Sequence, residues 1–216
     1  ASNGLARQEL VRLYRRAFQV LCMGVFHIRP ARLGDARDLG ALIDIAGEGI
    51  PSIFWREVAP RGQSALDFGA DRARRTGVAF SYENALIAET GGAVAAMALA
   101  YRQPVHMPPP DYDDMPPLAR PLAALEIEAP DTVYLNALAA YAPYRSKGAG
   151  GALLEVVEED ARRTGAPGLS LIASDHNTGA IRLYERVGFR ETARRAMQGH
   201  AEYSATGDWI LMVKSF

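Results

Sequence analysis

The chain is organised around residues 131–163, which read DTVYLNALAAYAPYRSKGAGGALLEVVEEDARR. Residues 133–140 are nearly all apolar and include β-formers, which predicts a short strand buried on both faces. Pro143 ends this strand. After a basic, glycine-rich turn, apolar side chains recur at helical spacing at Leu153, Leu154, Val157 and Ala161. The stretch therefore predicts a buried strand, a tight turn and an amphipathic helix that closes at Gly165.

The turn between this strand and helix has the chemistry of an anion site. It consists of Arg145, Ser146, Lys147, Gly148, Ala149, Gly150 and Gly151. The first N–H groups of a helix have no intrahelical partner and lie at the positive end of the helix dipole, so they can hold a phosphate. Glycines keep side chains away from those donors, and the two cations add positive charge. The alternative is a glycine-rich connection with two solvated cations.

Two common phosphate loops do not match this turn. A P-loop needs a glycine, then any four residues, then Gly-Lys-Ser/Thr, and the chain has no such run. A dinucleotide loop needs the pattern G-x-G-x-x-G, but Leu153 stands at the position of the third glycine. The chain instead has R-x-x-G-x-G from Arg145 to Gly150, directly after the strand. This motif resembles the acyl-CoA motif of the GNAT superfamily of N-acetyltransferases, in which a pyrophosphate sits on these amides.

A second segment supports the resemblance independently. Residues 169–190, LSLIASDHNTGAIRLYERVGFR, predict a strand at 169–173 and a short helix at 179–187. This segment is similar to the other half of the GNAT cofactor site, with Asn177, the pair Leu183-Tyr184 and the closing Gly-Phe. The two segments have the order and separation that the superfamily shows, and together they span residues 131–190.

The resemblance implies an α/β (α+β) fold with one GNAT-like domain and a mixed, mostly antiparallel central sheet flanked by helices. We expect this domain over residues 24–216, after an N-terminal helical extension over residues 1–23, where apolar residues recur at roughly helical spacing. The extension is a poor match to a signal peptide, because Arg15 and Arg16 interrupt its apolar stretch.

The resemblance also implies an acetyl-CoA-dependent N-acetyltransferase in which a primary amine attacks the thioester directly, without an acyl-enzyme. A bulge in the central strand would expose backbone groups that hold the pantetheine and the thioester carbonyl, at Leu138, Ala139 and Ala140. Tyr184 would protonate the departing sulfur, which a phenol with an ordinary pKa of about 10 can do at neutral pH. Asn177 is a helix cap by residue type and would also touch the pantetheine arm.

The general base is missing from the pattern. Several family members carry a glutamate where this chain has Tyr134, and Asn136 on the same face is not a base. Glu126 or Glu128 acting through water, or an amine that enters neutral, remain open. Two other functions also remain: a CoA-binding sensor without turnover, and an acyltransferase with a longer acyl donor, for which the small residues along the strand leave room.

The flanking segments are compatible with this fold. Asp35 caps a helix that Gly47, Gly49 and Pro51 would end, and residues 52–77 read as a loop followed by a second helix. Residues 85–101 predict a hairpin around Gly91-Gly92, and residues 209–214 a last strand. Prolines exclude regular structure from much of residues 105–131, which we expect to form an acidic loop. This loop either overhangs the acceptor site and attracts a cationic amine, or is merely solvated. Three aromatic residues are candidate walls of an acceptor pocket, or simply core: Phe54, Trp55 and Phe68.

Composition limits the remaining classes. The chain has 216 residues, 49% hydrophobic and 23% charged, with a net charge of −1, which does not suggest nucleic-acid binding. Cys22 is the only cysteine and the four histidines have no metal-binding spacing, so we expect neither disulfides nor a metal. The sequence contains no apolar run of 18 residues, so we expect no membrane span. Because a single cysteine is typical of a reducing compartment, we expect a cytoplasmic protein. The expected acceptor is a small-molecule amine or a peptide, and homodimers are common in proteins that this chain resembles.

Overall fold

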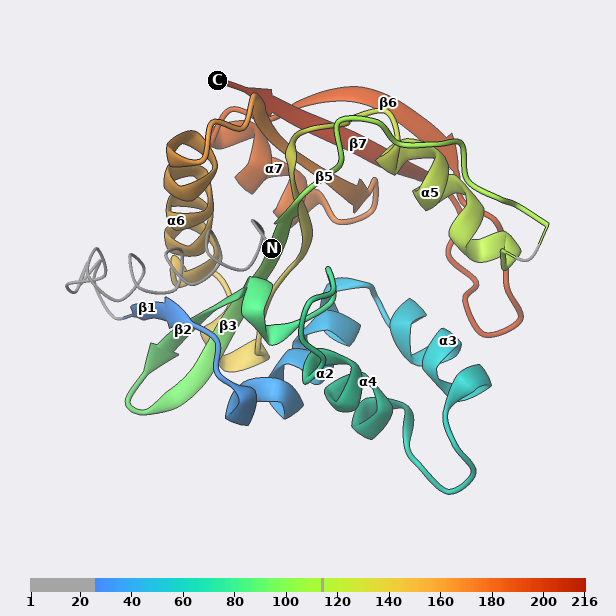
Figure 1. The fold of residues 1–216 in the computed structure, drawn as a ribbon, viewed down its shortest axis with the longest axis horizontal. Coiled ribbons are helices and arrows are strands. Elements are labelled where there is room, and N and C mark those ends of the chain that lie inside the picture. The colour runs from blue at the N-terminus through green and yellow to red at the C-terminus, as the bar shows by residue number, and fades with distance from the viewer. Residues whose placement is uncertain (1–25, 114) are drawn as a thin grey trace.

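The computed structural model describes residues 26–113 and 115–216 (Figure 1). The helix expected over residues 1–23 lies outside the described residues. The seven strands form one sheet in the order β1-β2-β3-β4-β5-β7-β6. They are β1 (His27–Pro30), β2 (Ala85–Thr90), β3 (Ala93–Arg102), β4 (Val133–Ala140), β5 (Gly168–Ser174), β6 (Arg190–Ala196) and β7 (Asp208–Ser215). All neighbours pair antiparallel except β4 and β5, which confirms the mixed, mostly antiparallel sheet.

Helices cover both faces of this sheet. They are α2 (Ala36–Ala46), α3 (Ile50–Val58), α4 (Ala65–Ala73), α5 (Arg120–Glu126), α6 (Ala149–Arg163) and α7 (Thr178–Arg186). Figure 1 shows α6 and α7 on one side of the central strands and α2 and α4 on the other. The first pair shares a hydrophobic cluster with one face of the sheet, and α2 and α4 share a second cluster with the opposite face. A third cluster joins α3 and α5 to β7.

A β-bulge in β4 reverses which side chains face each layer. Leu99 of β3 pairs with Ala137, but the next residue, Ala100, pairs with Leu135, so Asn136 is the extra residue. Before the bulge, Leu135 packs on the α6 side. After it, Ala137 packs on the α2 side, whereas Leu138 returns to the α6 side. After the bulge, each β4 side chain therefore faces the opposite layer from the one that it would face in a regular strand. This change occurs where β4 and β5 separate.

Two helices begin at prolines that the sequence analysis read as breaks. Pro51 lies in the first turn of α3, so residues 52–58 are helical and not a loop. Pro121 lies in the first turn of α5, within the segment 105–131. A proline in the first turn loses no hydrogen bond, because the first N–H groups of a helix have no intrahelical acceptor. The prolines therefore mark helix starts.

The three aromatic residues considered as walls of an acceptor pocket pack in the hydrophobic core. Trp55 is 5% exposed, belongs to the α2–α4 cluster and makes an edge contact with the Phe80 ring at 6.2 Å between centroids. Phe68 packs against the same cluster, and Phe54 packs against the cluster of α3 and α5. None of the three lines the main cavity described below.

Candidate active site

The centre of the sheet opens between β4 and β5. These parallel strands pair at only two positions, Val133 with Leu169 and Tyr134 with Ser170. Beyond these pairs, β4 continues to Ala140 and β5 to Ser174 without a further partner in each other, among the described residues. A cavity of about 690 Å³ occupies the opening. Its walls come from β4, the start of α6, α7 and the turn between α2 and α3.

The start of α6 presents unpaired amide groups to this cavity. Gly148 caps the helix with φ of 94°, and Ser146 also has a positive φ of 59°, a conformation that turns consecutive N–H groups outward. The first backbone bond of the helix is the one from Ala152 N–H to the Gly148 carbonyl, at 3.0 Å. Within the described part of the chain, the N–H groups of residues 146–151 donate to no backbone or side-chain acceptor. This is the donor set that a diphosphate needs.

Space is also available at this helix start. A Cβ built on Gly151 meets no atom within 4 Å, so no described side chain fills the space beside this residue. A Cβ on Gly150 would lie 3.3 Å from Leu183 Cδ2, because Gly150 packs against α7. Six of the seven predicted loop residues line the cavity: Arg145, Ser146, Gly148, Ala149, Gly150 and Gly151. The seventh, Lys147, is exposed and does not line it.

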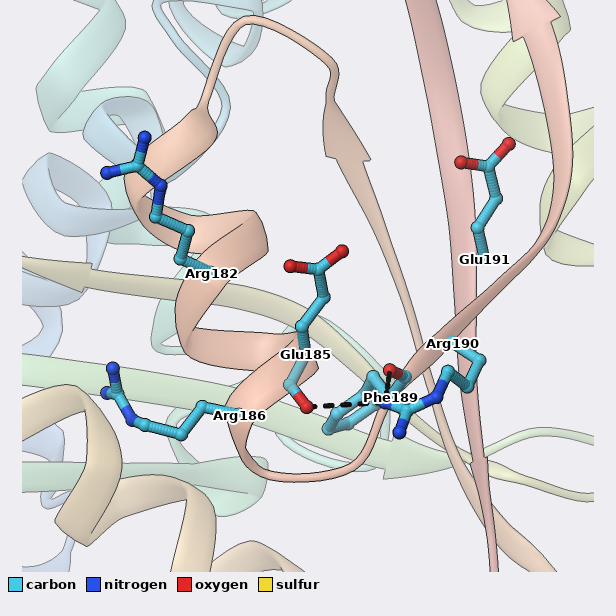
Figure 2. A pocket seen from close by; sticks show the side chains of 6 residues that line it. All are labelled: Arg182, Glu185, Arg186, Phe189, Arg190 and Glu191. Carbon is cyan, nitrogen blue, oxygen red and sulfur yellow. Dashed lines mark hydrogen bonds between the residues drawn. The ribbon is translucent and has the colours of Figure 1, made fainter.

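Positive charge surrounds this end of the cavity. Arg145 donates from Nε to the Ala140 carbonyl at 3.2 Å, which joins the loop to the end of β4. Arg186 from α7 also lines the cavity, and the sequence analysis did not identify it. Figure 2 shows Arg182 and Arg186 extending to the same side of α7, away from Glu185. Arg182 and Arg186 are four residues apart, and this spacing in the sequence predicts that both lie on the same face of the helix.

A second hollow, of about 490 Å³, lies between α7 and β6 (Figure 2). It is lined by Arg182, Glu185, Arg186, Phe189, Arg190 and Glu191. Its walls carry charges of both signs, and none of them belongs to β4 or to the glycine-rich loop. Arg186 is shared with the main cavity, so this hollow adjoins its cationic end.

Tyr184 forms part of the cavity wall from α7. Its side chain is 7% exposed and contacts the Phe189 ring edge-on at 5.8 Å between centroids. Its hydroxyl makes no hydrogen bond to a described residue. The hydroxyl oxygen is also not sealed from solvent, unlike the three unpaired side-chain atoms of the described residues that are. Burial raises the pKa of Tyr184 to about 12, because the phenolate would lose its hydration. The phenol is therefore a neutral proton donor at physiological pH.

The other predicted site residues also reach the cavity. Leu138, Ala139 and Ala140 lie in its β4 wall, on the part of the strand that pairs with β3 but not with β5. Asn177 lines the cavity and caps α7: its side-chain oxygen accepts from Ala180 N–H at 3.2 Å, as its residue type predicts. The bulged Asn136 lines the cavity as well.

The two glutamates considered as relays do not line this cavity. Glu126 accepts from Gln103 Nε2 at 2.7 Å, and Glu128 pairs with Arg195. Tyr134, where family members carry a glutamate, is buried and packs edge-on against Tyr101. A carboxylate that the sequence analysis did not consider, Glu48 in the turn between α2 and α3, does line the cavity.

These features define an α/β protein whose opened sheet holds a cavity with unpaired helix-start amides at one end. The chain belongs to the GNAT acetyltransferase family, whose model matches residues 51–189. No curated protein matches the sequence at a significant level.

Solved structures share the fold at low identity. An N-acetyltransferase from Staphylococcus aureus Mu50 aligns with a TM-score of 0.59 and 18% identity, over 86% of this chain and 98% of that one. The protein yncA from Salmonella typhimurium, described as an acetyltransferase and solved with its cofactor acetyl-CoA, aligns with a TM-score of 0.57 and 20% identity, over 89% and 94%. The ribosomal-protein-S18-alanine N-acetyltransferase from Escherichia coli aligns with a TM-score of 0.52 and 19% identity, over 88% and 93%.

No helix in residues 26–113 and 115–216 is long and apolar enough to span a membrane. The same residues contain no group of three or more His, Cys, Asp or Glu side chains that could hold a metal ion.

Proposed function

We propose that this protein is an N-acetyltransferase that moves the acetyl group of acetyl-CoA to a primary amine within a ternary complex. One observation carries the proposal: the helix start with its unpaired amides, the part of β4 that does not pair with β5, and Tyr184 all border one cavity. Membership of the GNAT acetyltransferase family supports it, as does the acetyl-CoA-bound relative of the same fold.

The cavity suits a long ligand with an anionic end. Helix-start amides, Arg145 and Arg186 would hold the pyrophosphate of CoA, and the backbone of residues 138–140 would hold the pantetheine arm. The arm would then bring the thioester towards Tyr184. Among the described residues that line the cavity there is no cysteine, no serine-histidine pair and no lysine placed to form an acyl-enzyme, and direct attack needs none of these groups.

The reaction balances with the groups present. The neutral amine nitrogen attacks the thioester carbon, the C–N bond forms and the C–S bond breaks. The departing thiolate takes the phenolic proton of Tyr184, which later regains one from solvent. The attacking nitrogen gives up one proton to solvent water as the amide forms, which balances the proton that Tyr184 regains from solvent.

The test combines binding with turnover. Calorimetry with CoA should show a saturable site, and the wild-type protein should release free thiol from acetyl-CoA in the presence of spermidine, free lysine or an alanine-initiated peptide. Binding without turnover of any amine would favour a CoA-binding sensor. Faster turnover of succinyl-CoA than of acetyl-CoA would favour a longer acyl donor. Absence of CoA binding would refute the proposal.

A further inference from the structure

The main cavity has a charge at each end. Arg145 and Arg186 lie at the end formed by α6 and α7. Glu48 is the only acidic residue among all those that line the cavity in the described part of the chain, and it comes from the turn between α2 and α3. Because α2 and α6 cover opposite faces of the sheet, the carboxylate and the phosphate-binding amides approach the opening from opposite sides (Figure 1).

Glu48 is held in place by its backbone and by one hydrogen bond. Its φ is 55°, a left-handed value that is uncommon for a residue with a side chain, and it lies between Gly47 and Gly49 where α2 gives way to α3. The Tyr203 hydroxyl donates to Glu48 Oε2 at 3.1 Å from the loop between β6 and β7. That single donor leaves the second carboxylate oxygen without a hydrogen bond from any described residue.

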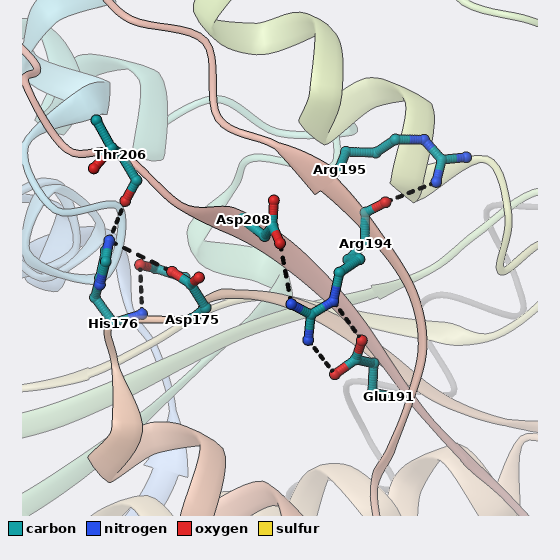
Figure 3. Close-up of polar contacts among 8 residues, drawn as sticks. Asp175, His176, Glu191, Arg194, Arg195, Thr206 and Asp208 are labelled. Atoms are coloured by element: carbon teal, nitrogen blue, oxygen red, sulfur yellow. Dashed lines mark hydrogen bonds and ion pairs between the residues drawn. The ribbon is translucent and has the colours of Figure 1, made fainter.

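The charged and titratable groups around Glu48 come from two further segments. Burial, followed by the charge of Glu48, raises the pKa of Tyr203, so this phenol stays neutral and acts as a donor. His176 and Asp175 follow β5 (Figure 3). The Thr206 carbonyl first, and then the charges of Asp175 and Glu48, raise the pKa of His176. This end of the cavity is therefore acidic, and its histidine ring is already engaged by Thr206.

A second observation marks the same wall. Trp209 lines the cavity, stacks on Tyr203 at 6.5 Å between ring centroids and is 6% exposed. Its Nε1 is sealed from solvent and has no hydrogen-bond acceptor among the described residues. Because this nitrogen is sealed from solvent, Trp209 contributes an aromatic surface to the cavity wall and not a hydrogen-bond donor.

We propose that Glu48 binds the acceptor amine and takes its proton before attack on the thioester. An amine that enters as an ammonium ion has no lone pair for attack. Transfer of one N–H proton to a carboxylate oxygen of Glu48 gives a neutral amine and a neutral Glu48 acid, after which the transfer already described proceeds. This proposal rests on the proposed function, and it assigns the base to the α2–α3 turn and not to the central strand.

The assignment also implies the class of acceptor. The described residues that line the cavity place only a carboxylate, and no cation, at the end away from the glycine-rich loop. A cationic amine is attracted there, whereas an acceptor with a carboxylate next to its amine would be repelled by Glu48. We therefore expect spermidine and the alanine-initiated peptide to be better acceptors than free lysine acetylated at its α-amine.

The test compares three variants with the wild type in the spermidine and peptide assays. Glu48→Gln keeps the shape and removes the base, and Tyr203→Phe removes only the hydrogen bond to it. Glu159→Gln is the control, because Glu159 is an exposed glutamate of α6 outside the cavity. We expect Glu48→Gln to lower kcat/KM for the amine at pH 7 by about 100-fold, Tyr203→Phe by less, and Glu159→Gln not at all. The Kd for CoA should stay within about twofold in all three, as binding of the nucleotide does not use Glu48.

The pH dependence distinguishes a proton acceptor from a structural residue. An alkyl ammonium has a pKa near 10, so more amine enters neutral as the pH rises and the defect of Glu48→Gln should shrink. A defect that is constant with pH, or that comes with lost CoA affinity, would overturn the inference, as would full activity of Glu48→Gln. If the wild type binds CoA but acetylates no amine, the proposed function fails first and the role of Glu48 fails with it.

Discussion

The hydroxyl oxygens of Thr132 and Ser170 lie 2.7 Å apart in the buried interior, at the closed end of the opening between β4 and β5. The Thr132 hydroxyl also donates to the Ala129 carbonyl at 2.7 Å, so Ser170 is the donor in the pair. This bond lies beside the two paired positions of the parallel strands and links the segments at the end where the strands are still paired.

Ser170→Ala should therefore destabilise the protein. It removes a buried donor and leaves a lone pair of Thr132 without its partner, which costs about 1–2 kcal/mol in the free energy of unfolding. Urea denaturation monitored by circular dichroism measures this loss. Ser204→Ala, on an exposed loop position, is the control and should change stability little. Equal stability of the two variants would mean that the buried pair does not hold the strands.

Tyr184→Phe should separate binding from chemistry. The ring keeps its contact with Phe189, but the proton donor is lost, so kcat should fall about 100-fold while the Kd for CoA changes little. Since the pKa of Tyr184 is raised to about 12, its protonated form persists throughout the neutral range, and the phenol should cause no loss of activity below pH 10. A kcat for Tyr184→Phe close to that of the wild type would exclude this residue as the acid.

The raised pKa of Tyr184 also predicts a stability difference at high pH. An unfolded tyrosine ionises near pH 10, below the folded value of about 12, so the unfolded chain loses its proton first. The stabilisation of the neutral phenol is complete below pH 10 and is lost as the pH rises from 10 towards 12. The free energy of unfolding of the wild type should therefore fall over this range more steeply than that of Tyr184→Phe.

Two glycines in the anion loop should respond differently to alanine. Gly148 has φ of 94°, so Gly148→Ala strains the helix start by about 1–2 kcal/mol and should weaken both stability and CoA binding. Gly151 has open space for a Cβ and a helical backbone, so Gly151→Ala should keep or raise stability by up to about 1 kcal/mol. The new methyl group would still obstruct the diphosphate. Thermal melts and calorimetry with CoA test both, and unchanged affinity in Gly151→Ala would remove the loop from the binding site.

The sequence was sufficient where a single element carries its own pattern. The strand before the loop, the loop and α6 appear at the predicted positions because apolar spacing, glycines and the closing turn are all local. The hairpin around Gly91-Gly92 is confirmed for the same reason, as β2 and β3. These elements need no knowledge of the rest of the chain.

The sequence could not show features that depend on the partners of an element. β6 has no apolar alternation, since it is an edge strand whose residues are mostly exposed. It joins the sheet through its backbone pairing with β7, and Arg194 of β6 also forms an ion pair with Asp208 of β7 (Figure 3). Glu48 belongs to a connecting turn, and only the folded chain brings it to the wall shared with β4. Turn residues carry no periodic signal, so a carboxylate there is invisible to pattern analysis.

Arg186 and Arg182 provide a matched test of the cationic end. They lie one turn apart on α7 and extend to the same side, but only Arg186 lines the main cavity (Figure 2). Arg186→Ala should weaken CoA binding by about threefold to tenfold, an effect that should decrease with added salt because exposed charges are screened. Arg182→Ala should have the smaller effect. Equal effects of both would indicate a general charge contribution without a specific contact.

The close approach of Gly69 to the Trp55 ring predicts that a single added methyl group here destabilises the α2–α4 layer. A Cβ on Gly69 would lie 2.3 Å from Trp55 Cζ3, and the ring cannot move away freely because Trp55 is buried against Phe80. Gly69→Ala should therefore cost about 1–3 kcal/mol through overpacking. Gly34→Ala, where a Cβ meets no atom within 4 Å, is the control and should be nearly neutral.

The consequence of Gly69→Ala reaches the cavity, because α4 packs on α2 and α2 leads into the turn that carries Glu48. A displaced α2 would move the carboxylate but leave the start of α6 on the opposite face in place. We therefore expect Gly69→Ala, measured well below its melting temperature, to raise the KM for the amine while the Kd for CoA stays near the wild-type value. A loss of CoA affinity that matches the loss of amine turnover would show that the two faces of the sheet are not independent.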